Sequence, residues 1–134
     1  LGIVDALEFA QNTTQAISWT RQDIAINSSM HSTATNPSRV TPQTTGVYAC
    51  KATAYFRSAN GRSQLVNVED SSGGIVAHFQ ANTSTGLMSV TAFGLKRIDI
   101  VSATPWFRAV VLGDNSTQSL STLVGYTQFE VWKL

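Results

Sequence analysis

Apolar and polar residues alternate along much of the chain, which is the pattern of β-strands with one buried face rather than of helices. The clearest run covers residues 46–57, where the odd positions include Lys51, Thr53 and Arg57. The even positions of this run are apolar: Tyr48, Cys50, Ala52, Ala54 and Phe56. The pattern therefore predicts a strand whose even positions lie in the core.

A second run, residues 63–69, places Val66 and Val68 on one side and Asn67 on the other. Because Asn60-Gly61 stands between the two runs and Asn-Gly favours tight two-residue turns, the sequence predicts a hairpin that joins them. Short runs between Gly-, Ser- and Asn-rich segments predict further strands at residues 75–80, 86–97, 106–112 and 125–134.

The pattern is weaker before residue 46, where short strands are expected at residues 7–10, 16–19 and 23–26, followed by a long polar loop at 27–38. Eight or more strands in one short chain favour an all-β, two-sheet antiparallel sandwich of jelly-roll type. An immunoglobulin domain is less favoured, because the single cysteine leaves no pair for the disulfide typical of that fold. The expected organisation is an N-terminal arm or first strand (residues 1–15) and a jelly-roll domain (residues 16–134).

Composition indicates a surface covered by hydroxyl groups rather than by charge. Only 13% of the 134 residues are charged, 43% are hydrophobic, and Ser and Thr together number 31. The net charge of +1 lacks the surplus of Lys and Arg that nucleic-acid binding requires, so no nucleic-acid partner is expected. A surface with few charges suits a chain held in a fixed assembly. A monomer kept soluble by its hydroxyl groups is the alternative.

Neither a membrane span nor a signal peptide is predicted. No apolar run approaches the ~18 residues of a transmembrane helix, and the N-terminal residues lack a basic segment followed by an apolar one. Cys50 is the single cysteine, so no disulfide framework is expected. Its place in the apolar stripe predicts a core residue rather than a reactive thiol.

Side chains that carry catalytic chemistry are sparse. The only imidazoles are His31, in the polar loop, and His78, in a predicted strand, and no Gly-x-Ser-x-Gly turn accompanies them. One cysteine and two distant histidines do not make a zinc site. Glu69 and Asp70 are adjacent acids at the end of a predicted strand, where a solvated edge is the usual explanation. We therefore expect no enzyme activity, no cofactor, and no catalytic or metal-binding residues.

Aromatic residues are the remaining candidates for a binding surface, namely Trp19, Trp106 and Trp132. The last strand is apolar on both faces, because Phe129 and Val131 alternate with another partly apolar set: Tyr126, Gln128, Glu130, Trp132 and Leu134. The simplest cover for the outer face is another copy of the chain. The alternative is the N-terminal segment of the same chain.

Several motifs resemble one family. The stretch 39–48 resembles the Pro-x-x-Gly-x-Tyr region of complement one-q and tumour necrosis factor jelly rolls, although the spacing from Pro42 to Gly46 is one residue longer. The run 30–39, then Asn60-Gly61-Arg62 and the ending 129–134, are similar to the complement one-q-like domains of tailed-bacteriophage virion proteins. The resemblance covers about residues 17–134.

The resemblance implies a homotrimer about a threefold axis, with the inner sheet of each subunit facing its neighbours. The strand from residue 46 and the last strand then lie side by side in that sheet, and Lys51 and Glu130 are expected to approach each other near the interface. The residues expected in the subunit interface are Lys51, Tyr55, Tyr126, Gln128, Glu130, Trp132 and Leu134.

The function expected from this resemblance is that of a non-enzymatic virion protein. It would be a trimeric decoration (cement) or head-fibre protein on the capsid exterior, bound to the major capsid protein or another virion component. The alternative is the receptor- or carbohydrate-binding head of a tail fibre, whose loops 27–38 or 114–121 would contact a host-surface glycan. A depolymerase, the third possibility, conflicts with the missing acid–base pair.

Overall fold

The chain folds into a β-sandwich in which every regular element of the described residues is a strand. The computed structural model describes residues 8–9, 14–19, 30–32, 34–56, 63–82, 88–101, 104–113, 118–120 and 127–134. The strands are β1 (Glu8–Phe9), β2 (Gln15–Ala16), β3 (Arg39–Val40), β4 (Gly46–Phe56), β5 (Ser63–Asp70), β6 (Ile75–Asn82), β7 (Met88–Ile98), β8 (Phe107–Gly113), β9 (Gln118–Ser119) and β10 (Gln128–Lys133). All their pairings are antiparallel. The predicted all-β class and two-sheet antiparallel arrangement are confirmed.

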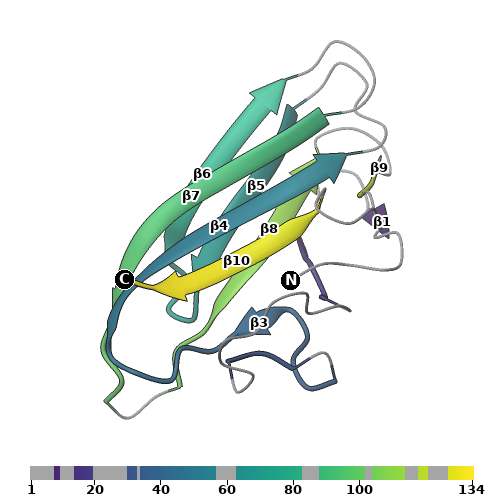
Figure 1. Cartoon of the computed structure of the whole chain (residues 1–134). Coiled ribbons are helices and arrows are strands. Elements are labelled where there is room, and N and C mark those ends of the chain that lie inside the picture. The colour runs from purple at the N-terminus through teal and green to yellow at the C-terminus, as the bar shows by residue number, and fades with distance from the viewer. Residues whose placement is uncertain are drawn as a thin grey trace.

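One layer is a three-stranded sheet in the order β10-β4-β7, with the long strand β4 in the centre (Figure 1). Cys50 pairs with Val131 on one side and with Gly94 on the other. The even positions of β4 are buried, as their alternation predicts. The predicted adjacency of this strand and the last strand is confirmed by the pairing of β4 with β10.

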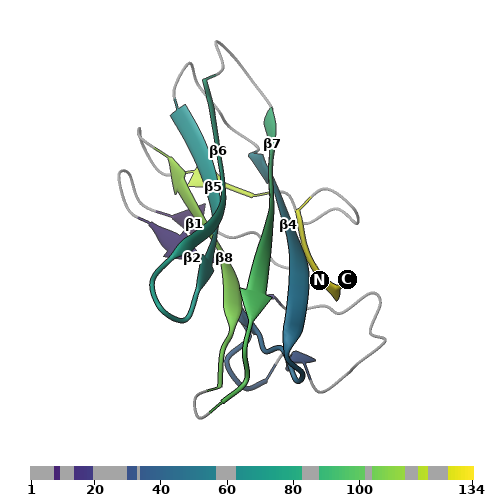
Figure 2. The same ribbon diagram turned by 90° about the vertical axis from the view of Figure 1, so that its left-hand side faces the viewer.

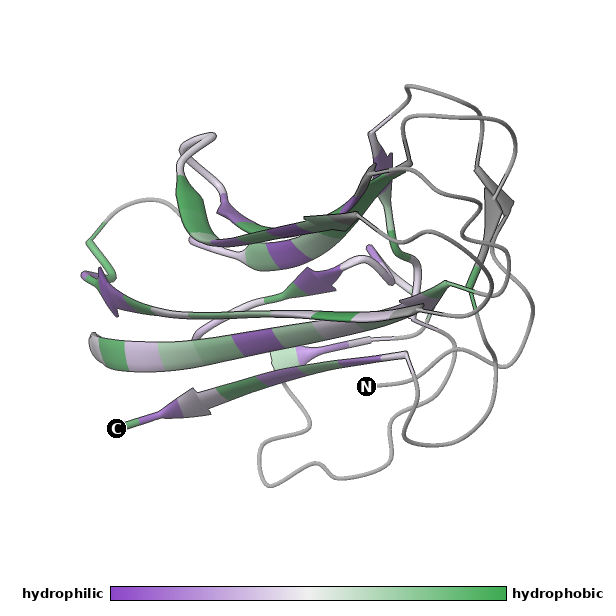
Figure 3. Ribbon diagram, turned by 90° about the horizontal axis from the view of Figure 1, so that it is seen from above, coloured by the Kyte–Doolittle hydropathy of each residue, from purple (hydrophilic) through white to green (hydrophobic). Residues whose placement is uncertain are grey.

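The opposite layer is a five-stranded sheet in the order β2-β8-β5-β6, with β3 also paired to β8. Strands β2 and β3 share one edge of β8: Ala16 pairs with Val110, and Val40 pairs with Phe107. Figures 2 and 3 show the two sheets as separate layers. A further pair, β1 with β9, joins Glu8–Phe9 to Gln118–Ser119.

The short elements differ from the predicted ones. Strands β3 and β9 are absent from the sequence-based assignment, and the expected strand at residues 23–26 lies outside the described residues. The strand expected at 16–19 is shifted toward Gln15–Ala16. Two-residue strands have too few positions for an alternating pattern, so periodicity does not reveal them.

The predicted hairpin around Asn60-Gly61 is wrong, because β4 and β5 belong to different sheets. Residues 57–62 lie outside the described part of the chain, but the partners of both strands are clear: β4 pairs with β10 and β7, and β5 pairs with β6 and β8. The apolar faces of β4 and β5 meet across the core instead of continuing one sheet. A turn signal is local, whereas the choice of sheet is set by which faces must be buried together.

The tight hairpin lies one connection later, between β5 and β6. The backbone N–H of Asp70 donates to the carbonyl of Gly74 at 2.9 Å, and the N–H of Gly73 donates to the carbonyl of Asp70 at 3.0 Å. Gly73 has φ 83°, a left-handed conformation that glycine adopts at no steric cost. The bulge between Val68 and Glu69 shifts the register just before this turn.

The core between the sheets is built from aromatic and small aliphatic side chains. The rings of Trp19 and Phe129 are stacked with centroids 5.9 Å apart. Cys50 is fully buried, as its place in the apolar stripe predicts, and burial raises the pKa of its thiol to about 12. On β7, Gly94 faces the backbone of β6 so closely that a Cβ there would collide with the carbonyl oxygen of Val76. Any larger residue at this position would push the two sheets apart.

Candidate self-association surface

The outer face of the three-stranded sheet is the surface that the sequence marks as a candidate interface. The odd positions of β4 point away from the core, and the strand pairings place their partners from β7 and β10 beside them. We call this surface the outer face; its members are Val47, Ala49, Lys51, Thr53, Tyr55, Ser89, Thr91, Phe93, Leu95, Arg97, Gln128, Glu130 and Trp132, with Leu134 at the end of β10.

An exposed apolar patch occupies the part of the outer face near the C-terminus. Phe93 is 58% exposed, Leu95 54%, Trp132 41% and Leu134 66%. The rings of Phe93 and Trp132 lie over β4 with their centroids 6.1 Å apart. Ala49 is fully buried although it belongs to this face, because its register partners are Trp132 and Leu95. The small residue in the central strand lets the larger side chains on both sides form one continuous surface.

Lys51 and Glu130 lie beside this patch and form an ion pair. They are register partners on β4 and β10, and their Nζ and Oε2 atoms are 3.2 Å apart. The predicted approach of these two side chains is confirmed. Their side chains are 37% and 40% exposed in the single chain, so the pair contributes about 0–1 kcal/mol to the stability of the isolated subunit.

Other polar groups on the outer face also have partners within the chain. The hydroxyl groups of Thr53 and Thr91 hydrogen-bond at 3.0 Å. The backbone N–H of Tyr55 donates to Oγ1 of Thr127 at 3.2 Å. Burying this face against another protein would therefore leave few of these polar groups unpaired, while the apolar side chains would lose their contact with water.

Six of the seven predicted interface residues lie on or at the end of this face, namely Lys51, Tyr55, Gln128, Glu130, Trp132 and Leu134, and the seventh, Tyr126, lies outside the described residues. The alternative cover is the N-terminal segment (residues 1–15). Of its described residues, Glu8 and Phe9 pair with β9 and Gln15 pairs with β8 of the opposite sheet, while residues 1–7 and 10–13 lie outside the described part of the chain. Phe93 and Leu95 were not predicted. The signal was present in β7, where they alternate with the core residues Val90 and Ala92, so that both faces of that strand are apolar.

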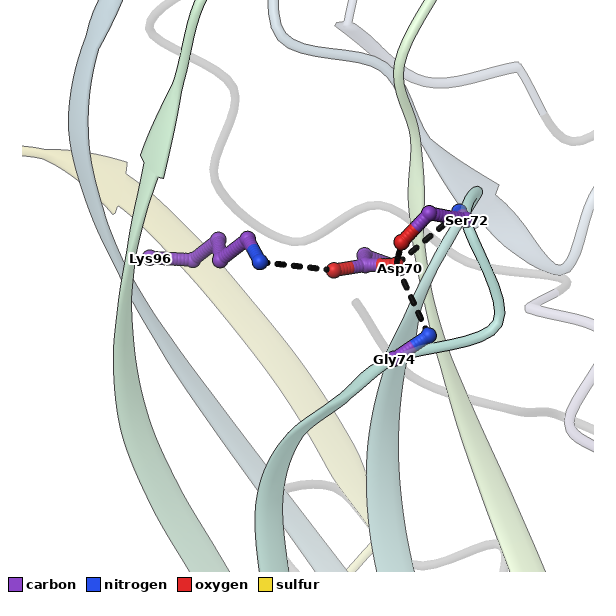
Figure 4. Close-up of polar contacts among 4 residues, drawn as sticks. All are labelled: Asp70, Ser72, Gly74 and Lys96. Atoms are coloured by element: carbon purple, nitrogen blue, oxygen red, sulfur yellow. Dashed lines mark hydrogen bonds and ion pairs between the residues drawn. The ribbon is translucent and has the colours of Figure 1, made fainter.

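The acidic pair Glu69-Asp70 is not the solvated edge that the sequence suggested. Asp70 is only 5% exposed and lies between the two sheets. Its Oδ1 accepts the backbone N–H groups of Ser72 at 2.9 Å and Gly74 at 3.0 Å, and its Oδ2 lies 3.2 Å from Nζ of Lys96 on the opposite sheet (Figure 4). Glu69 pairs instead with Arg108 at 2.9 Å.

The contacts around Asp70 set the protonation of its carboxyl group. Burial acts to raise its pKa, but the hydrogen bonds from Ser72, Gly74 and Lys96 favour the charged form more strongly, so the pKa lies below its ordinary value of 3.8. The carboxylate therefore remains ionised at neutral pH, caps the β5–β6 turn and ties it to β7. The sequence shows the Ser-Ser-Gly-Gly turn but not the lysine that reaches it from another strand.

The histidines and tryptophans lie in separate environments. Nδ1 of His78 is 2.7 Å from Oδ1 of Asn67 on the neighbouring strand, whereas His31 lies in the segment before β3. The described residues contain no group of three or more His, Cys, Asp or Glu side chains placed to hold a metal ion. Trp19 is a core residue, Trp106 is half-buried, and only Trp132 lies on the outer face.

The class of protein that the fold defines is an antiparallel β-sandwich with an exposed apolar face on one sheet. The sequence matches no protein-family model and no curated protein. Among the described residues, no helix has the length and apolar character needed to span a membrane.

Proposed function

We propose that this protein is a non-enzymatic structural subunit that associates with copies of itself through the outer face of its three-stranded sheet. The observation that carries the proposal is the exposed apolar patch around Phe93 and Trp132. Contiguous apolar surface framed by polar residues marks interaction sites on soluble proteins. The occupant we assign is a second copy, because the face carries Lys51 and Glu130 with balanced charge and the hydroxyl groups of Thr53 and Thr91 hydrogen-bond each other.

The proposed arrangement is a jelly roll in which three subunits surround a threefold axis. The path of the chain supports it: β4 lies in the three-stranded sheet, β5 and β6 in the five-stranded sheet, β7 in the first, β8 in the second and β10 in the first again. Repeated crossing between two antiparallel sheets is typical of jelly rolls. The resemblance to complement one-q and tumour necrosis factor domains adds the threefold axis, with the outer face turned toward it.

The proposed setting is the exterior of a tailed-bacteriophage particle, where the trimer would decorate the capsid or form a head fibre. This part rests on the motif resemblance at residues 30–39 and 129–134. Comparing particles with and without the protein by electron microscopy tests it. Extra density on the head is expected, and density confined to tail tips would contradict the capsid location and favour a tail-fibre head.

The oligomeric state is the direct test of the interface. Native mass spectrometry and sedimentation of the wild-type chain should give a trimer, and Phe93→Lys should give a monomer with an unchanged far-ultraviolet spectrum. Ile75→Lys is the matched control, because Ile75 is also apolar and 61% exposed but lies on β6 of the other sheet. A wild-type chain that stays monomeric at every concentration would overturn the proposal.

A further inference from the structure

A hollow of about 550 Å³ opens beside β3, at one end of the five-stranded sheet. The segment before and after β3 forms one wall, and Thr104 with Trp106 forms the other (β3 is marked in Figure 1). The volume falls in the range of small-molecule sites. The lining carries four hydroxyl groups and one amide group beside one indole and one guanidinium: Met30, His31, Ser32, Thr35, Asn36, Arg39, Thr41, Thr104 and Trp106.

Hydrogen bonds hold the β3 wall in place. The backbone N–H of Thr41 donates to the carbonyl of Met30 at 2.6 Å, and the N–H of Arg39 donates to the carbonyl of Asn36 at 2.9 Å. Oγ of Ser32 accepts two backbone N–H groups from the following turn, at 3.0 and 3.2 Å. The hollow is therefore a built feature of the fold.

The hollow carries an excess of positive charge from arginine. Arg39 and Arg108 are register partners on β3 and β8, and their guanidinium carbons lie 4.5 and 5.3 Å from the ring centroid of Trp106. Arg108 is neutralised by Glu69 at 2.9 Å. Arg39 makes no ion pair with any residue in the described ranges, so its guanidinium, held against the indole, has capacity for an anion.

His31 adds a buried polar atom to the same wall. The side chain is 8% exposed, and Nδ1 lies 2.9 Å from the carbonyl oxygen of Arg39. Because a carbonyl only accepts, Nδ1 carries a proton and donates. Nε2 is buried and has no hydrogen-bond partner among the described residues. Because Nε2 has almost no accessible surface, it lies behind the wall rather than at the surface of the hollow.

We propose that this hollow binds an acidic sugar unit. The guanidinium of Arg39 would bind its carboxylate, the hydroxyl side chains of the lining and the amide of Asn36 would bind its hydroxyl groups, and Trp106 would supply an apolar surface for the sugar ring. Planar guanidinium groups suit carboxylates, and hydroxyl and amide side chains suit the hydroxyl groups of a sugar. Arg39 and Arg108 lie on the sheet opposite the outer face, so the proposed site shares no residue with the proposed interface.

The test compares glucuronate with glucose, which lacks only the carboxylate, and with acetate, which lacks the sugar. Titration calorimetry of the wild-type chain should show glucuronate binding more tightly than either, with a change in tryptophan fluorescence. Arg39→Gln should weaken glucuronate binding at least about tenfold, because it removes a charge-assisted hydrogen bond. Lys133→Gln is the control and should bind as the wild type does, because Lys133 lies on β10 of the other sheet, outside the defined outer face, and its Nζ donates to Oγ1 of Thr44.

Several results would overturn the proposal: no glucuronate binding, equal binding of glucose, or equal binding by Arg39→Gln. Thermal melting verifies that each variant is folded. Arg39→Lys gives a second measurement: it keeps the charge but loses the planar guanidinium group, so a smaller loss of affinity is expected. Glucuronate bound by the monomeric Phe93→Lys variant supports the site even if the trimer fails, whereas a trimer that does not bind glucuronate refutes the site alone.

Discussion

Two lysine–carboxylate pairs, each with a separation of 3.2 Å, occupy opposite environments in this sandwich. Lys51 and Glu130 lie on the outer face, where both side chains are more than one-third exposed. Asp70 is 95% buried and receives three further hydrogen bonds, while Lys96 reaches it from the other sheet.

The difference lies in what each pair connects. Lys51 and Glu130 join neighbouring strands that are already hydrogen-bonded to each other, so the pair adds little within one subunit. Asp70 and Lys96 join two sheets whose strands are not paired with each other in the described ranges, and they fix the β5–β6 turn as well. The same kind of ion pair therefore joins the two sheets in one place and lies on an exposed sheet surface in the other.

The largest effect is expected on association. Trp132→Ala should weaken assembly by about 2–4 kcal/mol per interface, the range of an aromatic hot spot, while the isolated subunit stays folded because Trp132 is 41% exposed. Sedimentation over a range of protein concentrations measures the change. Ile75→Ala, on the other sheet, should assemble normally; equal assembly by Trp132→Ala would show that the outer face is not the contact.

Removing the buried carboxylate should mainly affect folding. Asp70→Ala leaves two turn N–H groups and the ammonium group of Lys96 without their acceptor, so the free energy of unfolding should fall by about 2–3 kcal/mol. Urea denaturation of a monomeric background such as Phe93→Lys measures it without interference from assembly. Glu130→Ala in the same background should cost less than about 1 kcal/mol, and equal losses would remove the distinction between the two pairs.

Acid should act on the buried pair. The folded pKa of Asp70 lies below the ordinary value of 3.8, so its contribution is fully present above that value. The contribution is lost as the pH falls through the folded pKa. Unfolding midpoints measured from neutral pH down to about pH 2 should drop less steeply in Asp70→Asn than in the wild type. If the unfolding midpoint falls equally steeply with decreasing pH in both proteins, another carboxyl group controls the loss of stability in acid.

The smallest effect is expected for the exposed pair. A double-mutant cycle with Lys51→Met and Glu130→Gln in a monomeric background should give a coupling energy below about 1 kcal/mol. The same cycle measured on assembly should give a larger coupling if the pair is buried at the interface. A coupling that is as small in assembly as in the monomer would place the pair at the rim.

The long strands were predictable because each has enough positions to show its alternation. Strand β4 and the runs that became β5, β6, β7, β8 and β10 were all anticipated, and so was the approach of Lys51 to Glu130. Apart from the adjacency of β4 and β10, the order of the strands was not, because Asn60-Gly61 signals a turn without revealing which sheet follows it. Phe93 and Leu95 were not predicted as interface residues, because the sequence analysis identified two apolar faces only in the last strand.

The site details that escaped prediction depend on residues far apart in the chain. Asp70 and Lys96 are joined across the two sheets, and no local pattern indicates that this acid is buried. Arg39 and Arg108 meet at Trp106 only because the short strand β3 pairs with β8, and a two-residue strand has no visible period. Packing between strands therefore brings together side chains that are far apart in the sequence, and local sequence patterns do not reveal these contacts.

The buried thiol of Cys50 can report the transient separation of the two sheets. The residue is the single cysteine, is fully enclosed between the sheets and has a pKa of about 12, so a thiol-reactive label can modify it only in molecules whose layers have separated. The labelling rate then counts transient openings under native conditions, with no engineered probe. Slower labelling in particles or trimers than in a monomeric variant would measure how much assembly holds the layers together.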